Sequence, residues 1–274
     1  METKRAVVRA VAYASAIALV VWTARSALLV LPLSRVAMLA TDALASSLVL
    51  ALAAFGIASV AGAPPAARLG LRAGALRARH VAIGALGVVA LSHAAESALR
   101  WLDVASPALA RFDEAFAGVD LEGALYPFAV LTLASACGEE LFFRGLLQRG
   151  LVRRIGAPGG VALAALAFGA AHADWLHGAA AFLLGLFLGA IAQRADSIRP
   201  AIAAHAANNG VALIEKLGGF QPPEGPLGTP VALLLSLTLA CVSAIALTRA
   251  SPAASLQRPD GPADNGRQAE RTGG

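Results

Sequence analysis

The chain has 274 residues, of which 58% are hydrophobic and only 14% are charged, whereas an average soluble domain is about half apolar and about one quarter charged. The formal net charge of +5 does not indicate nucleic-acid binding, because the arginines lie mostly in short segments between long apolar runs, as in membrane proteins. The composition therefore excludes an ordinary soluble domain and predicts an integral membrane protein with several spans.

Apolar runs recur along the whole chain, and a membrane-spanning helix needs about 20 such residues at about 1.5 Å of rise each. We expect an all-α, polytopic helix bundle of about eight transmembrane helices. The predicted ranges are 8–31, 37–61, 80–99, 123–149, 159–173, 176–193, 199–215 and 229–248. The fifth to seventh runs are short or interrupted by polar residues, so a count of seven stays open. The first run lacks a clear cleavage site, so we expect it to be retained as an anchor.

Basic residues alternate with acidic ones in the connections between these runs. The N-terminal segment METKR and the connections after the second, fourth and sixth runs are basic, whereas the loop from Leu102 to Glu122 carries five acidic residues against one arginine. Because positive charge accumulates on the cytoplasmic side, we expect both termini in the cytoplasm. The preference for arginine and alanine is typical of a GC-rich bacterial genome, so the expected membrane is the cytoplasmic (inner) membrane of a bacterium.

The fourth predicted span contains Glu139, Glu140 and Arg144 in the stretch ACGEELFFRGLLQ. A charge at the bilayer centre costs at least about 2.5–3.5 kcal/mol on insertion scales, so such residues are functional candidates. Glu140 and Arg144 are four residues apart and can pair on one helical face, whereas Glu139 points about 100° away. Glu139 could then face a cavity and act as a general base. The alternative is an ion pair that only joins helices.

Two further spans carry polar residues at a spacing of four. They are Phe168 and His172 in FGAAH, and His205, Asn208 and Asn209 in HAANN. By helical rise, Glu139 and His172 lie about 15–21 Å from the same turn and could meet, whereas His205 lies only about 9 Å beyond Arg199 and fits less well. A lone histidine on an apolar helix is more often a packed core residue, but three polar groups in succession favour a shared site.

The third predicted span carries a second charged group near its outer end. His93 and Glu96 are three residues apart, and Glu96 is four residues from Arg100. Long side chains near the end of a span can extend their charges to the membrane surface. We therefore expect this group to be mainly structural.

Together the three motifs resemble those of the CPBP intramembrane proteases, a family that includes the type II CAAX prenyl proteases and bacterial bacteriocin-processing, Abi-type immunity and protein-sorting relatives. EELFFR resembles EExxxR, FGAAH resembles FxxxH, and HAANN resembles HxxxN. The resemblance covers about residues 123–215. It divides the chain into an N-terminal part with three helices and the outer loop (1–122), catalytic helices (123–250) and a tail (251–274) whose proline, glycine and charge predict disorder.

The resemblance implies an intramembrane endopeptidase of the glutamate type. The implied catalytic set is Glu139, Glu140, His172, His205 and Asn209, with Arg144, Phe168 and Asn208 as supporting residues. Glu139 would activate water with help from His172. His205 and Asn209 would bind the oxyanion of the tetrahedral intermediate.

We expect no cofactor; the alternative is zinc held by His172, His205 and Glu139, although the chain has no HExxH motif. The expected partners are the lipid bilayer and a protein or peptide substrate with a hydrophobic C-terminal or leader segment. Two other functions stay open. One is a non-catalytic immunity or scaffold protein of the same fold. The other is a transporter with a glutamate–histidine proton relay, for which we would expect internal repeats that the sequence does not show.

Overall fold

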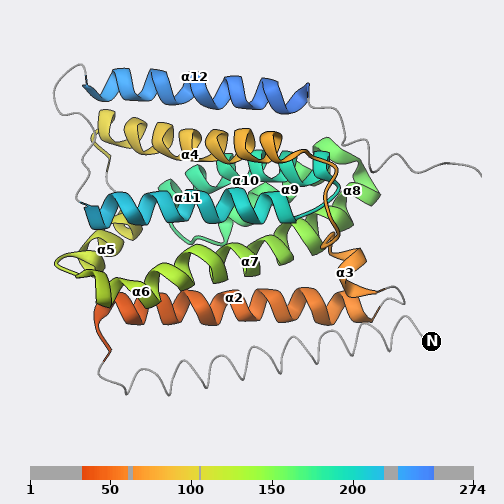
Figure 1. Ribbon diagram of the computed structural model, residues 1–274, viewed down its shortest axis with the longest axis horizontal. Coiled ribbons are helices and arrows are strands. Elements are labelled where there is room, and N and C mark those ends of the chain that lie inside the picture. Colours follow the sequence, from red (N-terminus) through yellow and green to blue (C-terminus); the bar gives the residue numbers. More distant parts are fainter. Residues whose placement is uncertain (1–32, 61–63, 105, 219–227, 250–274) are drawn as a thin grey trace, which may run out of the picture.

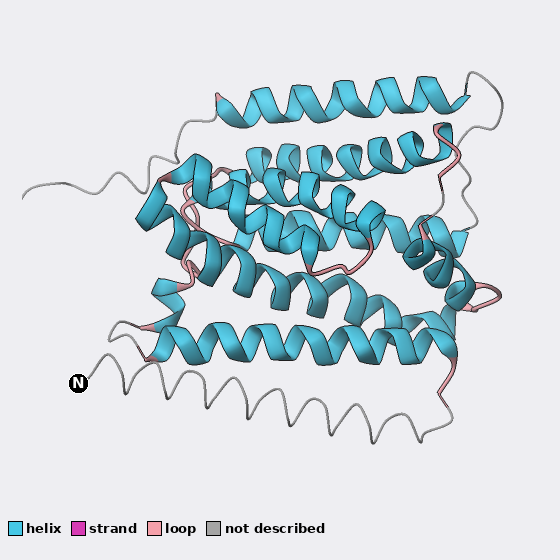
Figure 2. Cartoon of the chain, turned by 180° about the vertical axis from the view of Figure 1, so that it is seen from behind, coloured by secondary structure: helices cyan, strands magenta, loops and turns pink. Residues whose placement is uncertain are grey.

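The computed structural model describes residues 33–60, 64–104, 106–218 and 228–249. Every regular element in these ranges is a helix (Figures 1 and 2), which confirms the predicted all-α bundle. The elements are α2 (Arg35–Ser59), α3 (Pro65–Arg68), α4 (Ala78–Trp101), α5 (Pro107–Phe116), α6 (Leu121–Ala129), η1 (Val130–Ala134), α7 (Ser135–Glu140), η2 (Leu141–Gln148), α8 (Arg149–Ile155), α9 (Ala157–Ala170), α10 (Trp175–Ala195), α11 (Arg199–Gly218) and α12 (Gly228–Thr248). The predicted span 8–31 and the tail 251–274 lie outside the described residues.

Within the described ranges, five helices are long and apolar enough to cross a membrane. They are Arg35–Ser59, Ala78–Trp101, Leu121–Ile155, Trp175–Ala195 and Thr229–Thr248. The other two predicted spans within the described ranges also form helices, but α9 has only 14 residues and would extend about 21 Å, less than the hydrocarbon thickness of about 30 Å. The total of eight spans therefore stays a prediction.

The helices lie side by side in layers (Figure 1). At one side α12 packs on α4, and α4 packs on α11 and α10; at the other side α2 packs against the long helix that contains α7. The core between α4, α10, α11 and α12 contains Val88, Leu188, Ile191 and Leu247. α7, α10 and α11 therefore meet in the middle of the bundle.

The long helix from Leu121 to Ile155 changes its winding twice. Two π-helical stretches, η1 and η2, flank α7 on its two sides, and Pro127 precedes η1. Proline has no N–H to donate and disturbs the helical ladder around it. π-Helical turns bond i to i+5, are rare and often lie at functional sites. The six-residue segment that ends in Glu139 and Glu140 is thus set between two widened turns.

Glycines bring neighbouring helices into backbone contact on both sides of this segment. A Cβ on Gly138 would lie 2.7 Å from the Cα of Ser47 in α2. A Cβ on Gly169 would lie 2.5 Å from the carbonyl oxygen of Gly178, so α9 and α10 are equally close. Small residues permit such close approach between membrane helices.

The loop from Leu102 to Glu122 contains the helix α5, which the sequence analysis did not predict. The Ser106 hydroxyl caps its first turn by accepting from the Leu109 N–H at 3.3 Å. The same hydroxyl donates to Asp174 Oδ1 at 3.1 Å, and the Ala108 N–H donates to Asp174 Oδ2 at 3.4 Å. α5 is therefore attached to the turn between α9 and α10.

Candidate active site

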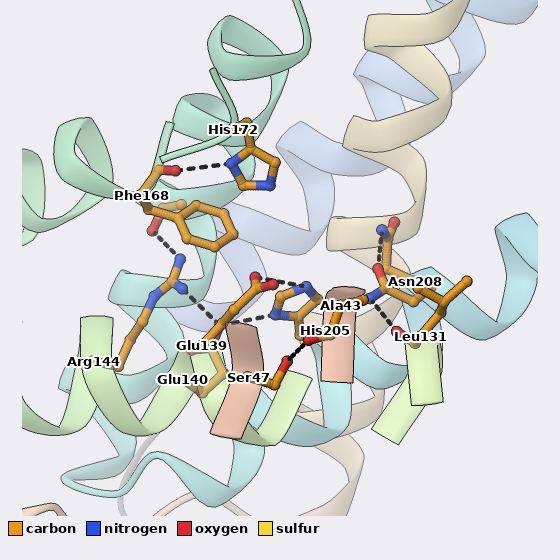
Figure 3. A network of polar contacts seen from close by, with 12 residues as sticks. Ala43, Ser47, Leu131, Glu139, Glu140, Arg144, Phe168, His172, His205 and Asn208 are labelled. Carbon is orange, nitrogen blue, oxygen red and sulfur yellow. Dashed lines mark hydrogen bonds and ion pairs between the residues drawn. The ribbon is translucent and has the colours of Figure 1, made fainter. Parts of the chain in front are cut away.

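The centre of the site is a fully buried ion pair between Glu140 and Arg144, with His205 bound to it (Figure 3). Arg144 Nη1 donates to Glu140 Oε1 at 2.6 Å, and the two side chains are 1% and 0% exposed. His205 Nδ1 lies 3.0 Å from the same oxygen. The pairing predicted from the spacing of four is confirmed, and α11 is joined to α7 through one carboxylate oxygen.

Arg144 also contacts both helices of the α9–α10 hairpin. Its Nη2 donates to the carbonyl oxygen of Gly185 at 3.3 Å, and its guanidinium lies 4.3 Å from the ring centroid of Phe168. A guanidinium at this distance from an aromatic ring is attracted by its π electrons. The charge of Arg144 therefore holds α7, α9 and α10 in one arrangement.

Phe168 lies among the aromatic rings of the site. Its ring is 5.0 Å from the ring of His172 and 5.9 Å from the ring of His205, with interplanar angles of 80° and 89°. Phe143 packs on it at 5.2 Å. Edge-to-face geometry of this kind is favourable and directional, so Phe168 fixes the separation of the two histidines.

Glu139 lies in a different environment from its neighbour. Its side chain is 23% exposed, and its ion-pair contact with a described residue is a long one, 3.9 Å from Oε2 to His205 Nε2. Successive helical residues point about 100° apart, and the structure confirms that Glu139 and Glu140 face different surroundings. Figure 3 shows the carboxylate of Glu139 between Arg144 and His205.

The ring of His172, in the turn after α9, is held by the last turn of that helix. Its Nδ1 lies 2.9 Å from the carbonyl oxygen of Phe168. A carbonyl oxygen only accepts, so Nδ1 is the protonated nitrogen, and in a neutral ring Nε2 carries the lone pair. Figure 3 shows this second nitrogen on the side of the ring that faces Glu139 and His205.

His205 lies deeper than its distance from Arg199 suggested. The turn before α11 is covered rather than exposed: Ser197 and Ile198 are 0% and 1% accessible. The Ser197 hydroxyl donates to the carbonyl oxygen of Arg72 at 2.7 Å, and the Ile198 N–H donates to that of Gly70 at 3.0 Å. Because the connection from α3 to α4 covers Ser197 and Ile198, one side of the turn before α11 is buried, and the second turn of α11 reaches Glu140.

The side chains of Asn208 and Asn209 form their hydrogen bonds away from Glu139 and Glu140. Asn209 Nδ2 donates to the carbonyl oxygen of Leu131 at 3.0 Å, and Asn208 Nδ2 donates to Asn209 Oδ1 at 3.4 Å. Leu131 lies in the π-helical stretch η1. The structure thus brings Glu139, Glu140 and His205 together, whereas Asn209 joins α11 to η1. The second amide hydrogen of Asn209 has no acceptor among the described residues.

His177 is a residue of this region that the sequence analysis did not select. Its ring centroid lies 4.6 Å from that of His172, at an interplanar angle of 63°, and it lies within electrostatic range of Glu139. The sequence held one clue: Asp174 precedes WLHG as an N-cap residue would, and so predicts a helix start that places His177 in its first turn.

The donor atoms do not form a ready metal site. Among the residues that the structure describes, no group of three or more histidine, cysteine, aspartate or glutamate side chains is spaced to hold a metal ion. The Nδ1 atoms of His172 and His205 are already engaged by Phe168 and Glu140, so that only Nε2 of each ring lacks a hydrogen bond to a described residue.

A comparison with known families identifies the same segment. Residues 121–211 match the family described as type II CAAX prenyl endopeptidase Rce1-like. No curated protein and no solved structure matches the chain significantly. The match begins with α6, ends within α11 and contains the three motifs EELFFR, FGAAH and HAANN. It confirms the resemblance to the CAAX proteases over residues 121–211, about one third of this membrane protein.

Proposed function

We propose that the protein is an intramembrane endopeptidase in which Glu139 activates the hydrolytic water. The observation that carries this proposal is the contrast between two adjacent glutamates. Glu140 is 0% exposed and shares one oxygen between Arg144 and His205, whereas Glu139 is 23% exposed and has no hydrogen-bond partner among the described side chains. A carboxylate free to accept a proton within hydrogen-bond reach of water is what a general base requires.

In the proposed reaction, a water molecule binds between Glu139 and His172. Glu139 takes its proton while Nε2 of His172, which carries a lone pair, accepts the second hydrogen as a hydrogen bond. The hydroxide attacks the carbonyl carbon of the scissile peptide. When the tetrahedral intermediate collapses, the C–N bond breaks, and Glu139 returns its proton to the leaving amine.

His205 is placed to stabilise the oxyanion. Its Nδ1–H is held by Glu140, and its Nε2 is the ring atom nearest Glu139. When the ring is doubly protonated, Nε2–H can donate to the developing negative charge, and the buried carboxylate of Glu140 balances the added positive charge. The free amide hydrogen of Asn209 is the second candidate donor. Removing one oxyanion donor typically costs about 10²–10³ in rate.

The surroundings of the site favour a substrate that enters from a membrane. The site lies among helices that are apolar enough to span a bilayer, and the matched family acts on CAAX proteins, as its description states. We propose a protein substrate with a hydrophobic C-terminal segment or leader, cleaved near that segment at the inner membrane, by chemistry that needs no metal.

The test is a cleavage assay with the purified protein in detergent, on synthetic peptides that carry a hydrophobic C-terminal tail or a leader. Glu139→Gln should lower kcat/KM by about 10²–10⁴, the usual contribution of a general base, and His172→Asn should lower it as well. The matched control is Glu96→Gln, because this glutamate also lies in a candidate membrane-spanning helix but is half exposed and belongs to none of the three motifs.

Each variant is assayed with and without a chelator. Activity that survives chelation and disappears with Glu139→Gln supports the proposal. Loss on chelation with recovery on added zinc would replace it with a metalloprotease. Cleavage by Glu139→Gln at the wild-type rate would overturn the assignment of the base. Absence of cleavage by every form would favour a non-catalytic immunity or scaffold protein.

A further inference from the structure

We propose that His177 is a positioning residue of the active site, whose ring holds the imidazole of His172 in its working orientation. This inference rests on the proposed function, in which Nε2 of His172 binds the attacking water. His177 belongs to none of the three motifs that identify the site. The argument is one of geometry alone.

The His172 ring is restrained on three sides. Its Nδ1 is bound to the carbonyl oxygen of Phe168 at 2.9 Å, the ring of Phe168 lies 5.0 Å away, and the ring of His177 lies 4.6 Å away. The first two restraints come from one residue near the end of α9, four positions back in the chain. His177 supplies the third from α10, so its removal would free the ring to turn about its own side-chain bonds.

The position of His177 is itself fixed. Its N–H donates to Asp174 Oδ1 at 2.8 Å, which caps the first turn of α10. The same carboxylate is bound by the Ser106 hydroxyl at 3.1 Å. Behind it, Gly178 is in backbone contact with Gly169 of α9. The first turn of α10 is therefore held by its cap and by its contact with α9. A side chain on such a fixed turn is a suitable support for a catalytic group.

The contact is between rings and not between hydrogen-bonding atoms. The interplanar angle is 63°, and no hydrogen bond joins the two imidazoles among the described atoms. Aromatic pairs at such angles are favourable through the edge of one ring and the face of the other. A phenylalanine at position 177 should therefore do what the histidine does, whereas a side chain without a ring should not.

The experiment compares His177→Phe with His177→Leu and His177→Ala in the cleavage assay. Leucine keeps much of the volume without a ring and guards against a variant that fails only because a cavity forms. The matched control is Trp175→Ala, which removes an aromatic ring from the same helical turn, where it is 77% exposed. Misplacing a catalytic group can cost up to about 10²-fold in rate.

We expect His177→Leu and His177→Ala to lower kcat by about 10- to 100-fold with KM unchanged, and His177→Phe and Trp175→Ala to retain wild-type kcat. Equal loss in the phenylalanine and leucine variants would overturn the proposal, because a nitrogen would then be required. Wild-type kcat in His177→Ala would overturn it too.

A second readout does not depend on activity. The ¹⁵N chemical shifts of the His172 ring nitrogens, assigned with a His172→Asn variant, report whether the proton resides on Nδ1. At a pH where the rings are neutral, wild type and His177→Phe should show this single tautomer, and His177→Leu should show a mixture. Unchanged shifts in His177→Leu would overturn the positioning role. If wild type cleaves no substrate, the proposed function fails, and this measurement alone decides the inference.

Discussion

Two glutamate–arginine pairs in this protein have the same spacing and the same length but different surroundings. Glu140–Arg144 and Glu96–Arg100 are both four residues apart, and both have an N–O distance of 2.6 Å. The first pair is 0–1% exposed, whereas the side chains of the second are 44% and 51% exposed. Distance and sequence spacing therefore say little about the importance of an ion pair; burial decides what its loss costs.

The surroundings differ in kind as well. The buried pair, Glu140–Arg144, has a histidine, a carbonyl oxygen and an aromatic ring as further partners. Near the exposed pair, Glu96–Arg100, His93 instead bonds to Glu215 of α11 at 2.9 Å, and the side chains of His93 and Glu215 are both 37% exposed. Water and lipid headgroups can replace such exposed partners, while nothing can replace those of a buried guanidinium.

The largest effect on stability is expected from Glu140→Ala. It leaves Arg144 buried without its carboxylate, and breaking one half of a buried pair typically costs about 3–5 kcal/mol. Glu96→Ala should cost no more than about 1 kcal/mol, as for exposed pairs. The unfolding midpoint of each variant in detergent measures the difference. Equal effects of the two variants would show that burial does not separate the pairs.

Arg144→Lys should have the next largest effect. Lysine keeps the charge but cannot present two nitrogens to Glu140 and Gly185 while lying over Phe168. Hydrogen bonds to charged groups contribute about 1.5–3 kcal/mol each, so a loss of that order is expected, with reduced cleavage. Arg100→Lys serves as the matched control and should leave both the unfolding midpoint and kcat unchanged; a similar loss there would argue against a special role for the inner guanidinium.

The sequence predicted most of the bundle because its apolar runs are long. Each predicted range within the described residues corresponds to a helix. The helix α5 was missed because a polar loop of its length gives no apolar run, although Ser106 followed by Pro107 is a typical helix start. Its attachment to Asp174, 66 to 68 positions away in the chain, could not be read from local pattern. Nor could the π-helical stretches, whose i to i+5 bonds leave no clear periodic signature in a largely apolar segment.

In the site, local relations were predictable and distant ones were not. The Glu140–Arg144 pair follows from spacing alone. The bond from His205 to Glu140 spans 65 positions, and it depends on how deeply the turn at Ser197 is buried. His177 was missed because its relation to His172 depends on where α9 ends and α10 begins, which is the least reliable feature of a sequence-based prediction.

Gly138→Ala is expected to disturb the Glu140–Arg144 pair by displacing the backbone of α7. The expected loss of stability is somewhat smaller than for Arg144→Lys. The added Cβ would meet the Ser47 Cα at 2.7 Å, and α2 would have to move away from α7. Overpacking of this kind costs about 1–3 kcal/mol, with lower activity because Glu139 follows directly in the chain. Gly150→Ala, in α8, is the control, because a Cβ there meets nothing within 4 Å and alanine favours a helix. If Gly138→Ala and Gly150→Ala have the same unfolding midpoint, α2 moves away from α7 without loss of stability, and the prediction is wrong.

The smallest expected effect concerns Asp174, a carboxylate stabilised mainly by hydrogen bonds. The hydrogen bond from the His177 N–H, followed by those from the Ser106 hydroxyl and the Ala108 N–H, holds the pKa of Asp174 below its usual value. Because the pKa is lower in the folded state, the unfolded chain binds more protons over this interval, and stability rises with pH. The contribution should be fully present above the unfolded pKa of about 3.9 and lost as the pH falls through the folded value.

The measurement is the difference in unfolding midpoint between wild type and Asp174→Asn, followed from pH 6 downwards. Asparagine is also a good N-cap residue, so the variant keeps the turn but cannot titrate. Wild type should be more stable at pH 6, and the difference should shrink as the pH falls below about 4. A difference that stays constant would show that the charge of Asp174 does not stabilise the α9–α10 turn. The hydrogen bonds of this side chain, without its charge, would then hold α5 and His177 in place, and Asp174→Asn should retain wild-type kcat.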